Sequence, residues 1–170
     1  NGSGAKVYGC TMEGRLAVAR IFSFQGGLTL QRSRYDVAQS WSDDDKVAPE
    51  REMFRSPNFY GYMVARYTPF KNFDIDLSGT YTGSMLTPHM KGSGTNVDVA
   101  VRTPSFWDMS CKLGYEFNIM GICRLKLYTG VKNIFNAYQK DFDKGEERDS
   151  GYIYGPSLPR SLVFGMGMNF

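Results

Sequence analysis

The residues of this 170-residue chain that could perform chemistry are few and lie in polar segments. His89 is the only histidine, and its setting TPHMKG is typical of a loop tip, where it could contact haem or a metal. A lone loop histidine is more often solvated, and this is the simpler expectation for His89. No spacing around it assembles a nucleophile, a base and an orienting group, so the sequence indicates no enzyme and predicts no cofactor.

Two acidic segments resemble calcium-binding loops only in part. SDDDK places carboxylates at 43–45, but no glycine or distal glutamate completes the motif. DFDKGEERDSGY begins like an EF-hand loop at Asp141, yet Tyr152 occupies position 12, where a bidentate glutamate is needed. We therefore expect solvated loops and no metal site in either segment.

Aromatic and basic loop residues are better candidates for ligand contact. Trp41, Tyr152 and Tyr154 offer rigid amphipathic surfaces, and Arg148 can hold an anionic group through two hydrogen bonds. Together with His89, these residues form the predicted ligand-binding set. The alternative is that they only pack the loops or belong to an aromatic girdle at a membrane surface.

The composition favours β-structure and argues against nucleic acid as a partner. Aromatic residues make up 15% of the chain and glycine contributes 19 residues, while the mean hydropathy is -0.37. No run approaches the roughly 18 consecutive apolar residues of a membrane helix. The net charge of +3 comes without a basic stripe. Three cysteines without CxxC spacing are expected to be unpaired, with Cys111 opposite about residue 129 and Cys123 opposite about residue 117.

Alternating apolar and polar residues predict long β-strands. The predicted strands are 4–17, 21–34, 58–68, 73–82, 107–118, 123–132 and 160–170. The segment 4–17 is the least regular, because neither of its faces is cleanly apolar. Most of these strands exceed the usual length of about 5–6 residues in soluble sheets, and a tilted strand needs about 9–11 residues to cross a bilayer.

The connections between these strands are of two kinds. Short turns are predicted near 18–21, 68–72 and 118–122, and long polar loops at 36–56, 86–103 and 136–158. Short turns at one end and long loops at the other are typical of outer-membrane barrels. One face of the strands carries charges such as Asp74 and Lys126, and the other ends in aromatic residues. We expect the apolar face to contact lipid and Phe170 to lie at the periplasmic interface.

Two C-terminal segments, GVKNIFNAYQKDFDKG and RDSGYIYGPSLPRSLVFGMGMNF, resemble the end of a TonB-dependent outer-membrane receptor of the Bacteroidetes type. The resemblance rests on the Asn-hydrophobe-hydrophobe-Asn turn at 133–136, Gly155 with Pro156, Pro159 with Arg160, and the terminal Phe170. YTGSMLTPHM and RTPSFWDMS are similar to the same group.

This resemblance implies an all-β fold, an antiparallel up-and-down transmembrane β-barrel. Residues 1–170 would supply about seven strands, the C-terminal third of a 22-stranded barrel whose plug and earlier strands lie elsewhere. It also implies the outer membrane of a Gram-negative bacterium as the location. The expected partners are outer-membrane lipid, the remaining strands and plug, TonB, and a small chelate ligand such as a ferric siderophore, haem or a cobalamin-like molecule.

Two other classes of protein remain open at this point. One is a small self-contained outer-membrane barrel with an adhesive or structural role, and the other is a soluble β-sandwich that binds carbohydrate. The pairing of the two edge strands distinguishes these classes from the receptor, because backbone groups without a hydrogen-bond partner are costly in hydrocarbon. The receptor hypothesis predicts that strand 160–170 pairs with 123–133 on one side and with a strand outside this chain on the other.

Overall fold

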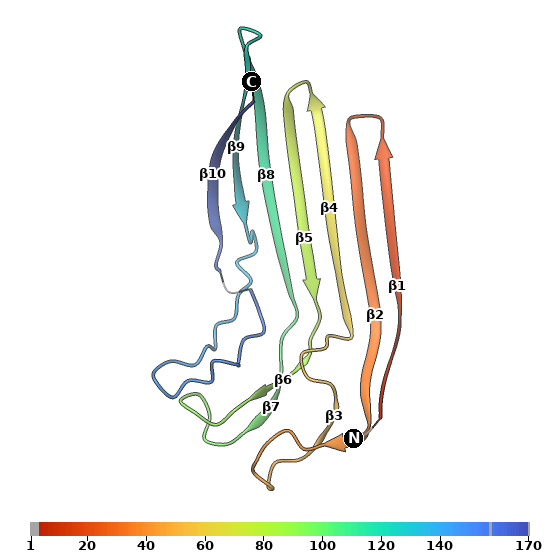
Figure 1. The fold of residues 1–170 in the computed structure, drawn as a ribbon, viewed down its shortest axis with the longest axis vertical. Coiled ribbons are helices and arrows are strands. Elements are labelled where there is room, and N and C mark those ends of the chain that lie inside the picture. Colours follow the sequence, from red (N-terminus) through yellow and green to blue (C-terminus); the bar gives the residue numbers. More distant parts are fainter. Residues whose placement is uncertain (1–3, 157, 170) are drawn as a thin grey trace.

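The fold is an all-β antiparallel sheet in which consecutive long strands are neighbours (Figure 1). The computed structural model describes residues 4–156 and 158–169. The long strands are β1 (Ala5–Val18), β2 (Phe22–Gln39), β4 (Phe59–Phe70), β5 (Phe73–Thr82), β8 (Phe106–Ile119), β9 (Cys123–Lys132) and β10 (Ser161–Asn169). Their order in the sheet is β1-β2-β4-β5-β8-β9-β10, which confirms the predicted up-and-down arrangement. No helix among the described residues is long and apolar enough to cross a membrane.

Three short turns join the long strands at one end of the sheet, at 19–21, 71–72 and 120–122, close to their predicted positions. In the β8–β9 turn, Met120 and Gly121 have φ angles of 50° and 73°, in the left-handed region that reverses a hairpin tightly. This hairpin extends beyond the other two (Figure 1).

The position of the β8–β9 turn also corrects the predicted cysteine register. Cys111 lies opposite Val131 and Cys123 opposite Ile119, each two residues beyond the predicted partner. The reason is that the hairpin is centred on Gly121, one residue later than the sequence suggested. The three cysteines are free, as expected.

The long connections at the other end contain more strand than predicted. β2 continues to Gln39, and β3 (Glu50–Glu52) pairs with its end. The predicted loop over 86–103 is wrong in part, because β6 (Leu86–His89) and β7 (Val99–Arg102) form a separate hairpin. Strands of four residues are too short to show a clear alternation in the sequence.

One face of the main sheet is apolar across all seven long strands. Residues that are cross-strand partners point to the same face of a sheet. Phe164 on β10 is the partner of Thr129 on β9, which is in turn the partner of Leu113 on β8. The registers of the remaining strands carry this same face across β5, β4 and β2 to β1. From the short turns up to the row of Cys10, Leu30 and Phe59, no described residue on this face is charged. Segment 4–17 is therefore one strand with an apolar row, which the sequence left uncertain.

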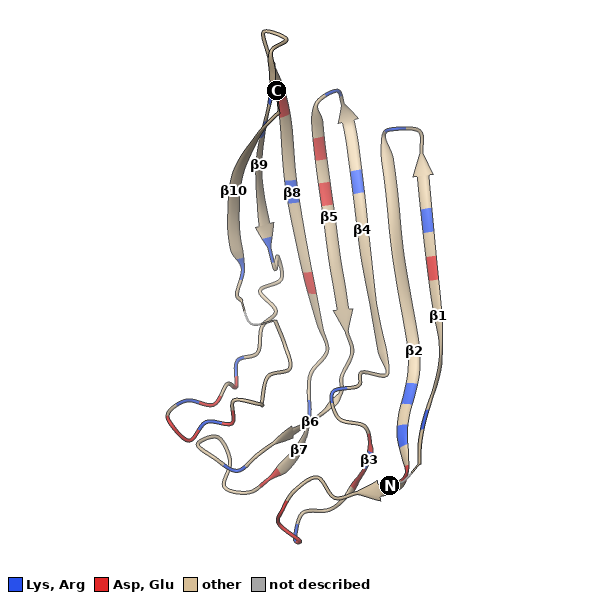
Figure 2. Ribbon diagram, viewed as in Figure 1, with Lys and Arg blue, Asp and Glu red and all other residues tan. Residues whose placement is uncertain are grey.

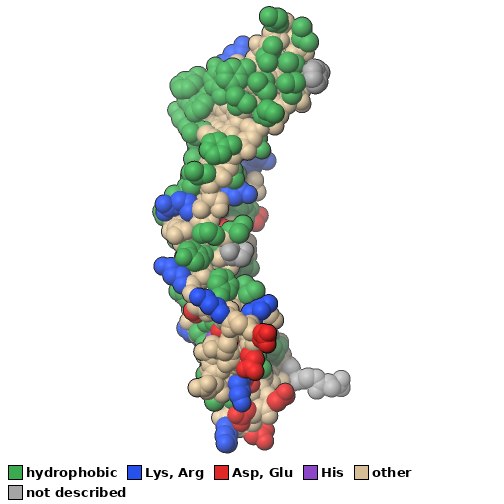
Figure 3. All heavy atoms as spheres, turned by 90° about the vertical axis from the view of Figure 1, so that its left-hand side faces the viewer, with side chains coloured by type: hydrophobic (Ala, Val, Ile, Leu, Met, Phe, Trp, Pro, Cys, Tyr) green, Lys and Arg blue, Asp and Glu red, His purple; other side chains and the backbone are tan. Residues whose placement is uncertain are grey.

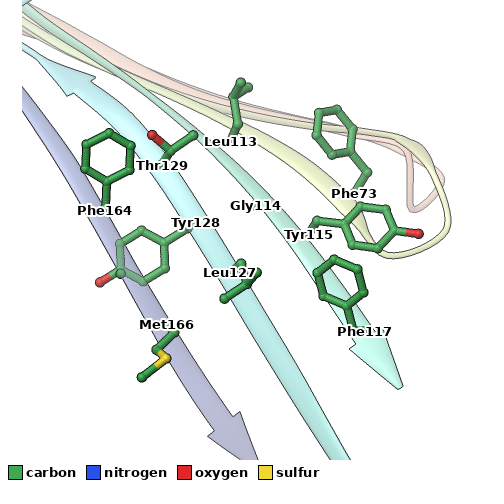
Figure 4. A pocket seen from close by; sticks show the side chains of 11 residues that line it. Phe73, Leu113, Gly114, Tyr115, Phe117, Leu127, Tyr128, Thr129, Phe164 and Met166 are labelled. Atoms are coloured by element: carbon green, nitrogen blue, oxygen red, sulfur yellow. The ribbon is translucent and has the colours of Figure 1, made fainter. Parts of the chain in front are cut away.

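The apolar face is exposed in this chain. Phe164 and Met166 on β10 are 76% and 78% exposed. A hollow of about 730 Å³ between β8, β9 and β10 is lined by side chains such as Leu113, Leu127 and Phe164 (Figure 4). Seen from the β10 side, hydrophobic side chains gather toward the short-turn end and charged side chains toward the long-loop end (Figure 3). Such a surface requires an apolar environment or a partner.

Aromatic rings border the apolar face at both ends. Near the long loops, the Tyr81 ring lies 5.2 Å from that of Phe59 and 5.0 Å from that of Trp107, measured between centroids. Near the short turns, Phe73 stacks on Phe70 with a centroid distance of 5.5 Å. Phe73 and Tyr81 lie eight residues apart on β5, or about 26 Å along the strand at roughly 3.3 Å per residue. Tilt reduces this height, which is compatible with the apolar band of about 25 Å in outer-membrane barrels.

The opposite face carries most of the strand charges, and most of these are ion-paired across strands, with the Lys126–Asp74 pair spanning β8. Asp76 accepts from Arg66 Nε at 2.6 Å and lies 3.0 Å from Lys112 Nζ. Lys126 Nζ lies 2.6 Å from Asp74. Figure 2 shows these charges as bands on the middle strands. The partition into one apolar and one polar face is as predicted.

The two outer strands of the sheet are β1 and β10. β10 pairs with β9, from Ser161 opposite Lys132 to Asn169 opposite Arg124, which confirms the predicted pairing. Within the described ranges β1 pairs only with β2, so the sheet does not close on itself. Phe170, predicted at the periplasmic interface, lies outside the described residues.

Candidate functional site

The three long connections pack together into one unit, here called the loop cap (residues 40–58, 83–105 and 133–156) (Figure 1). The buried hydrophobic residues of the described chain are Met85, Leu86 and Tyr152, and all three lie in this unit. The small core of the chain is thus in its loops, because both faces of the sheet remain open to their surroundings.

Polar contacts connect the first two connections of the loop cap. Arg102 forms a two-pronged ion pair with Glu52, at 3.3 and 2.6 Å. The Ser42 hydroxyl donates to Asp98 at 2.6 Å, and the Arg55 amide donates to the Leu86 carbonyl at 2.7 Å. The Ser42 hydroxyl, followed by the Lys91 amide, lowers the pKa of Asp98.

A second group of contacts joins the β6–β7 hairpin to the third connection. His89 Nε2 lies 3.0 Å from both carboxylate oxygens of Asp143. The Met90 amide donates to Asp149 at 2.8 Å, and the Ser93 amide donates to the Glu147 carbonyl at 3.0 Å. The three connections are therefore ordered relative to one another by their own hydrogen bonds.

His89 is buried, with 7% of its surface exposed, so the expectation of a solvated histidine is wrong. Its ring lies parallel to that of Tyr152, with centroids 3.8 Å apart and planes 4° apart. The Asp143 carboxylate contacts the Nε2 edge of the same ring. The Asp149 amide and then His89 lower the pKa of Asp143. The sequence could not show this enclosure, because Asp143 and Tyr152 come from a distant connection.

Asp141 binds two tyrosine hydroxyls. Tyr152 donates to one carboxylate oxygen at 2.9 Å and Tyr154 to the other at 2.6 Å. Gln139 supports this pair, because its side chain donates to the Tyr152 carbonyl and accepts from the Tyr154 amide. Burial, followed by the hydrogen bond to Asp141, raises the pKa of both phenols. Both tyrosines are therefore neutral donors at neutral pH.

The structure brings together three of the five predicted ligand-binding residues, namely His89, Tyr152 and Tyr154. Trp41 lies elsewhere, with its Nε1 donating to the Ala48 carbonyl at 3.1 Å and its ring edge-on to another aromatic ring. Arg148 is exposed and donates to the Gly145 carbonyl at 3.3 Å within its own turn.

The sequence did not indicate that Asp141 would hold two tyrosines or that Asp143 would hold His89. In the sequence, both aspartates resemble part of an incomplete calcium loop. The available signal was the acidic DFD at 141–143 close in sequence to the YIY at 152–154, since Asp141 accepts from both tyrosines. Beside these contacts lies a hollow of about 440 Å³, lined by residues of the third connection and of the β6–β7 hairpin such as His89, Ser93 and Lys144. Within the described residues, no group of three or more His, Cys, Asp or Glu side chains is arranged to hold a metal ion.

The geometry defines a class of fold: an up-and-down barrel-type sheet with short turns at one end and a packed loop cap at the other. Among solved structures, the chain is similar to the ferric-catecholate import receptor Fiu from E. coli K12 in its closed form. The TM-score is 0.69 and the identity 21%, over 96% of this chain and 21% of that one. It is also similar to the unliganded ferric citrate transporter FecA, with a TM-score of 0.65 and 19% identity, over 96% of this chain and 24% of that one.

No protein-family model and no curated protein matches the chain. At this level of identity, the likeness to Fiu and FecA shows the fold, which is that of a portion of a TonB-dependent receptor barrel. The chain spans about a fifth to a quarter of the two receptor structures.

Proposed function

We propose that residues 1–170 are the C-terminal part of the barrel of an outer-membrane receptor that imports a scarce ligand with energy supplied through TonB. The observation that carries this proposal is the partition of the sheet. An uncharged, aromatic-bordered face would contact lipid, and a face of paired charges would line the barrel interior. The remaining strands and a plug would come from other parts of the intact protein.

The open edges support a larger barrel over a small self-contained one. Both β1 and β10 present a row of backbone groups without a partner strand among the described residues. In hydrocarbon, each unsatisfied group costs several kcal/mol. We infer that strands of the same receptor cover both edges.

In the proposed mechanism, the loop cap faces the outside of a Gram-negative cell and captures the ligand. TonB then acts on the plug and opens a path along the polar face. Fiu and FecA are named as a ferric-catecholate import receptor and a ferric citrate transporter. Their names favour a ferric chelate over haem or a cobalamin-like molecule as the ligand of this receptor.

Within the loop cap, we assign different roles to the predicted residues. His89 and Tyr152 are packed against each other, so they would hold the shape of the surface. Tyr154, Arg148 and Trp41 retain exposed atoms and would contact the ligand directly. Arg148 suits an anionic chelate best, since among the described residues its guanidinium has only the Gly145 carbonyl, in its own turn, as a partner.

The test is uptake by the intact protein in an outer membrane. Cells expressing it should accumulate radioactive iron from a ferric chelate, and the same cells without TonB should not. Arg148→Ala should weaken binding of an anionic chelate by roughly tenfold, in the range of a lost charged hydrogen bond. A matched substitution at the opposite end, Lys71→Ala, should leave binding unchanged. Accumulation that does not depend on TonB would contradict the proposal.

A further inference from the structure

At the long-loop end of the sheet, the border of the apolar face carries cations on β1 and β2. Tyr8 pairs with Arg32, and Lys6 pairs with Arg34, so these side chains share the face of Cys10 and Leu30. The first charged residue beyond the apolar part of this face is Arg32, two positions after Leu30 along β2. In Figure 2 the positive charge appears as blue bands near the long-loop end of both strands.

A hollow of about 720 Å³ lies at this border. The apolar side chains in its lining are Tyr8, Cys10, Leu30 and Phe59, and Arg32 is the charged residue among its lining residues. An apolar floor that meets a guanidinium at one end matches an amphiphile, with a tail on the floor and an anionic group at the arginine.

The two arginines of β2 are free to take an anionic partner. Both Arg32 and Arg34 are exposed, and neither side chain has an ion pair or hydrogen bond with another described residue. The carboxylates nearby are already engaged, since Asp36 lies 2.9 Å from Lys6 Nζ and Glu52 is held by Arg102. The local charge therefore remains positive.

We propose that this border is a binding site for an anionic membrane lipid, a role that rests on the proposed function because it requires the apolar face to lie in a bilayer. The lipid phosphate contacts Arg32 and Arg34, and an acyl chain covers Cys10, Leu30 and Phe59. Guanidinium groups bind phosphate through paired hydrogen bonds, and cations at a membrane surface attract anionic headgroups. The adjoining apolar hollow favours a lipid over a soluble phosphate.

The experiment counts lipids retained by the intact receptor in detergent. The protein is equilibrated with equal amounts of phosphatidylglycerol and phosphatidylcholine carrying the same acyl chains, and bound lipid is measured by native mass spectrometry. We expect retention of phosphatidylglycerol to exceed that of phosphatidylcholine by roughly tenfold, from two surface arginines. The double variant Arg32→Gln, Arg34→Gln should remove this preference. Arg15→Gln, on β1 but on the opposite face, should keep it.

Three results would overturn the lipid site. The first is equal retention of both lipids, or a preference that survives in the double variant. The second is displacement of phosphatidylglycerol by excess inorganic phosphate, which would assign the arginines to free phosphate. The third is a mass increase by a second copy of the protein in place of lipid. A receptor that resides in the outer membrane but shows no lipid preference would refute this site and leave the proposed function standing.

Discussion

His89 and Tyr152 come from different connections and lie face to face, with ring centroids 3.8 Å apart and planes 4° apart. Asp143 lies 3.0 Å from the histidine Nε2, and Asp141 accepts from the Tyr152 hydroxyl. These contacts join the β6–β7 hairpin to the third connection, so the loop cap is expected to behave as one ordered unit rather than as separate flexible loops.

Replacing His89 by alanine should loosen the loop cap. The substitution removes the ring that covers Tyr152 and one hydrogen-bond partner of the Asp143 carboxylate. Hydrogen exchange of the amides at 141–154 in the intact protein should become roughly tenfold faster, while the main sheet stays protected. Lys144→Ala, an exposed change beside Asp143, serves as the control and should have little effect. Unchanged protection at 141–154 in the His89 variant would contradict the coupling.

Acid should open the loop cap through its carboxylates. The pKa values of Asp98 and Asp143 are lowered in the folded chain, by Ser42 and Lys91 in the first case and by Asp149 and His89 in the second. A carboxyl whose pKa is lower in the folded chain than in the unfolded chain stabilises the fold fully above its pKa in the unfolded chain, about 3.9. This stability is lost as the pH falls from there through the pKa of the folded chain. Protection factors in the loop cap, which correct each exchange rate for the intrinsic slowing of exchange in acid, should therefore fall below about pH 4. A loss of protection that is already complete at about pH 5 would show that other groups control the opening.

A pair of glycines on β10 provides a matched test of packing on the polar face. The Tyr128 ring lies over Gly165, and a Cβ at this position would overlap it. A Cβ at Gly167 would meet no atom within 4 Å. Gly165→Ala should destabilise the protein by about 0.5–1.5 kcal/mol, because the exposed Tyr128 ring must turn away from its preferred rotamer, and Gly167→Ala should be nearly neutral. Thermal unfolding of the intact barrel measures both, and equal effects would refute the predicted contact.

Removing the two tyrosine hydroxyls should have unequal effects. Tyr152 is 3% exposed, while Tyr154 is only partly buried, although both donate to Asp141. Tyr152→Phe should cost about 1–2 kcal/mol, because the carboxylate oxygen that it leaves is harder for water to reach. Tyr154→Phe should cost less and should mainly weaken ligand binding. A larger loss of stability in the Tyr154 variant would contradict this assignment of roles.

The long strands could be predicted from the sequence because their alternation extends over many residues. Segment 73–82 alternates without interruption, and its strand bounds are those expected. The β6–β7 hairpin could not be predicted, since four-residue strands carry little periodic signal. The contacts of His89 with Asp143 and Tyr152 join residues more than 50 positions apart, and local patterns do not encode such distances. For the same reason, the sequence does not show that Trp41 and Arg148 lie apart from the stacked His89 and Tyr152 rings.

The proposed barrel requires the apolar face of the sheet to meet lipid and the opposite face to line the interior. Leu77 and Ser78 lie on opposite faces of β5, midway between the aromatic residues Phe73 and Tyr81. The direct measurement introduces a single cysteine at either position in the intact protein without its native cysteines, attaches a fluorophore, and compares quenching by nitroxides. A nitroxide on the lipid acyl chains should quench the label at 77 but not at 78, and a water-soluble nitroxide should do the reverse. Quenching of the label at 78 by the lipid-bound nitroxide would contradict the proposed orientation of the barrel wall.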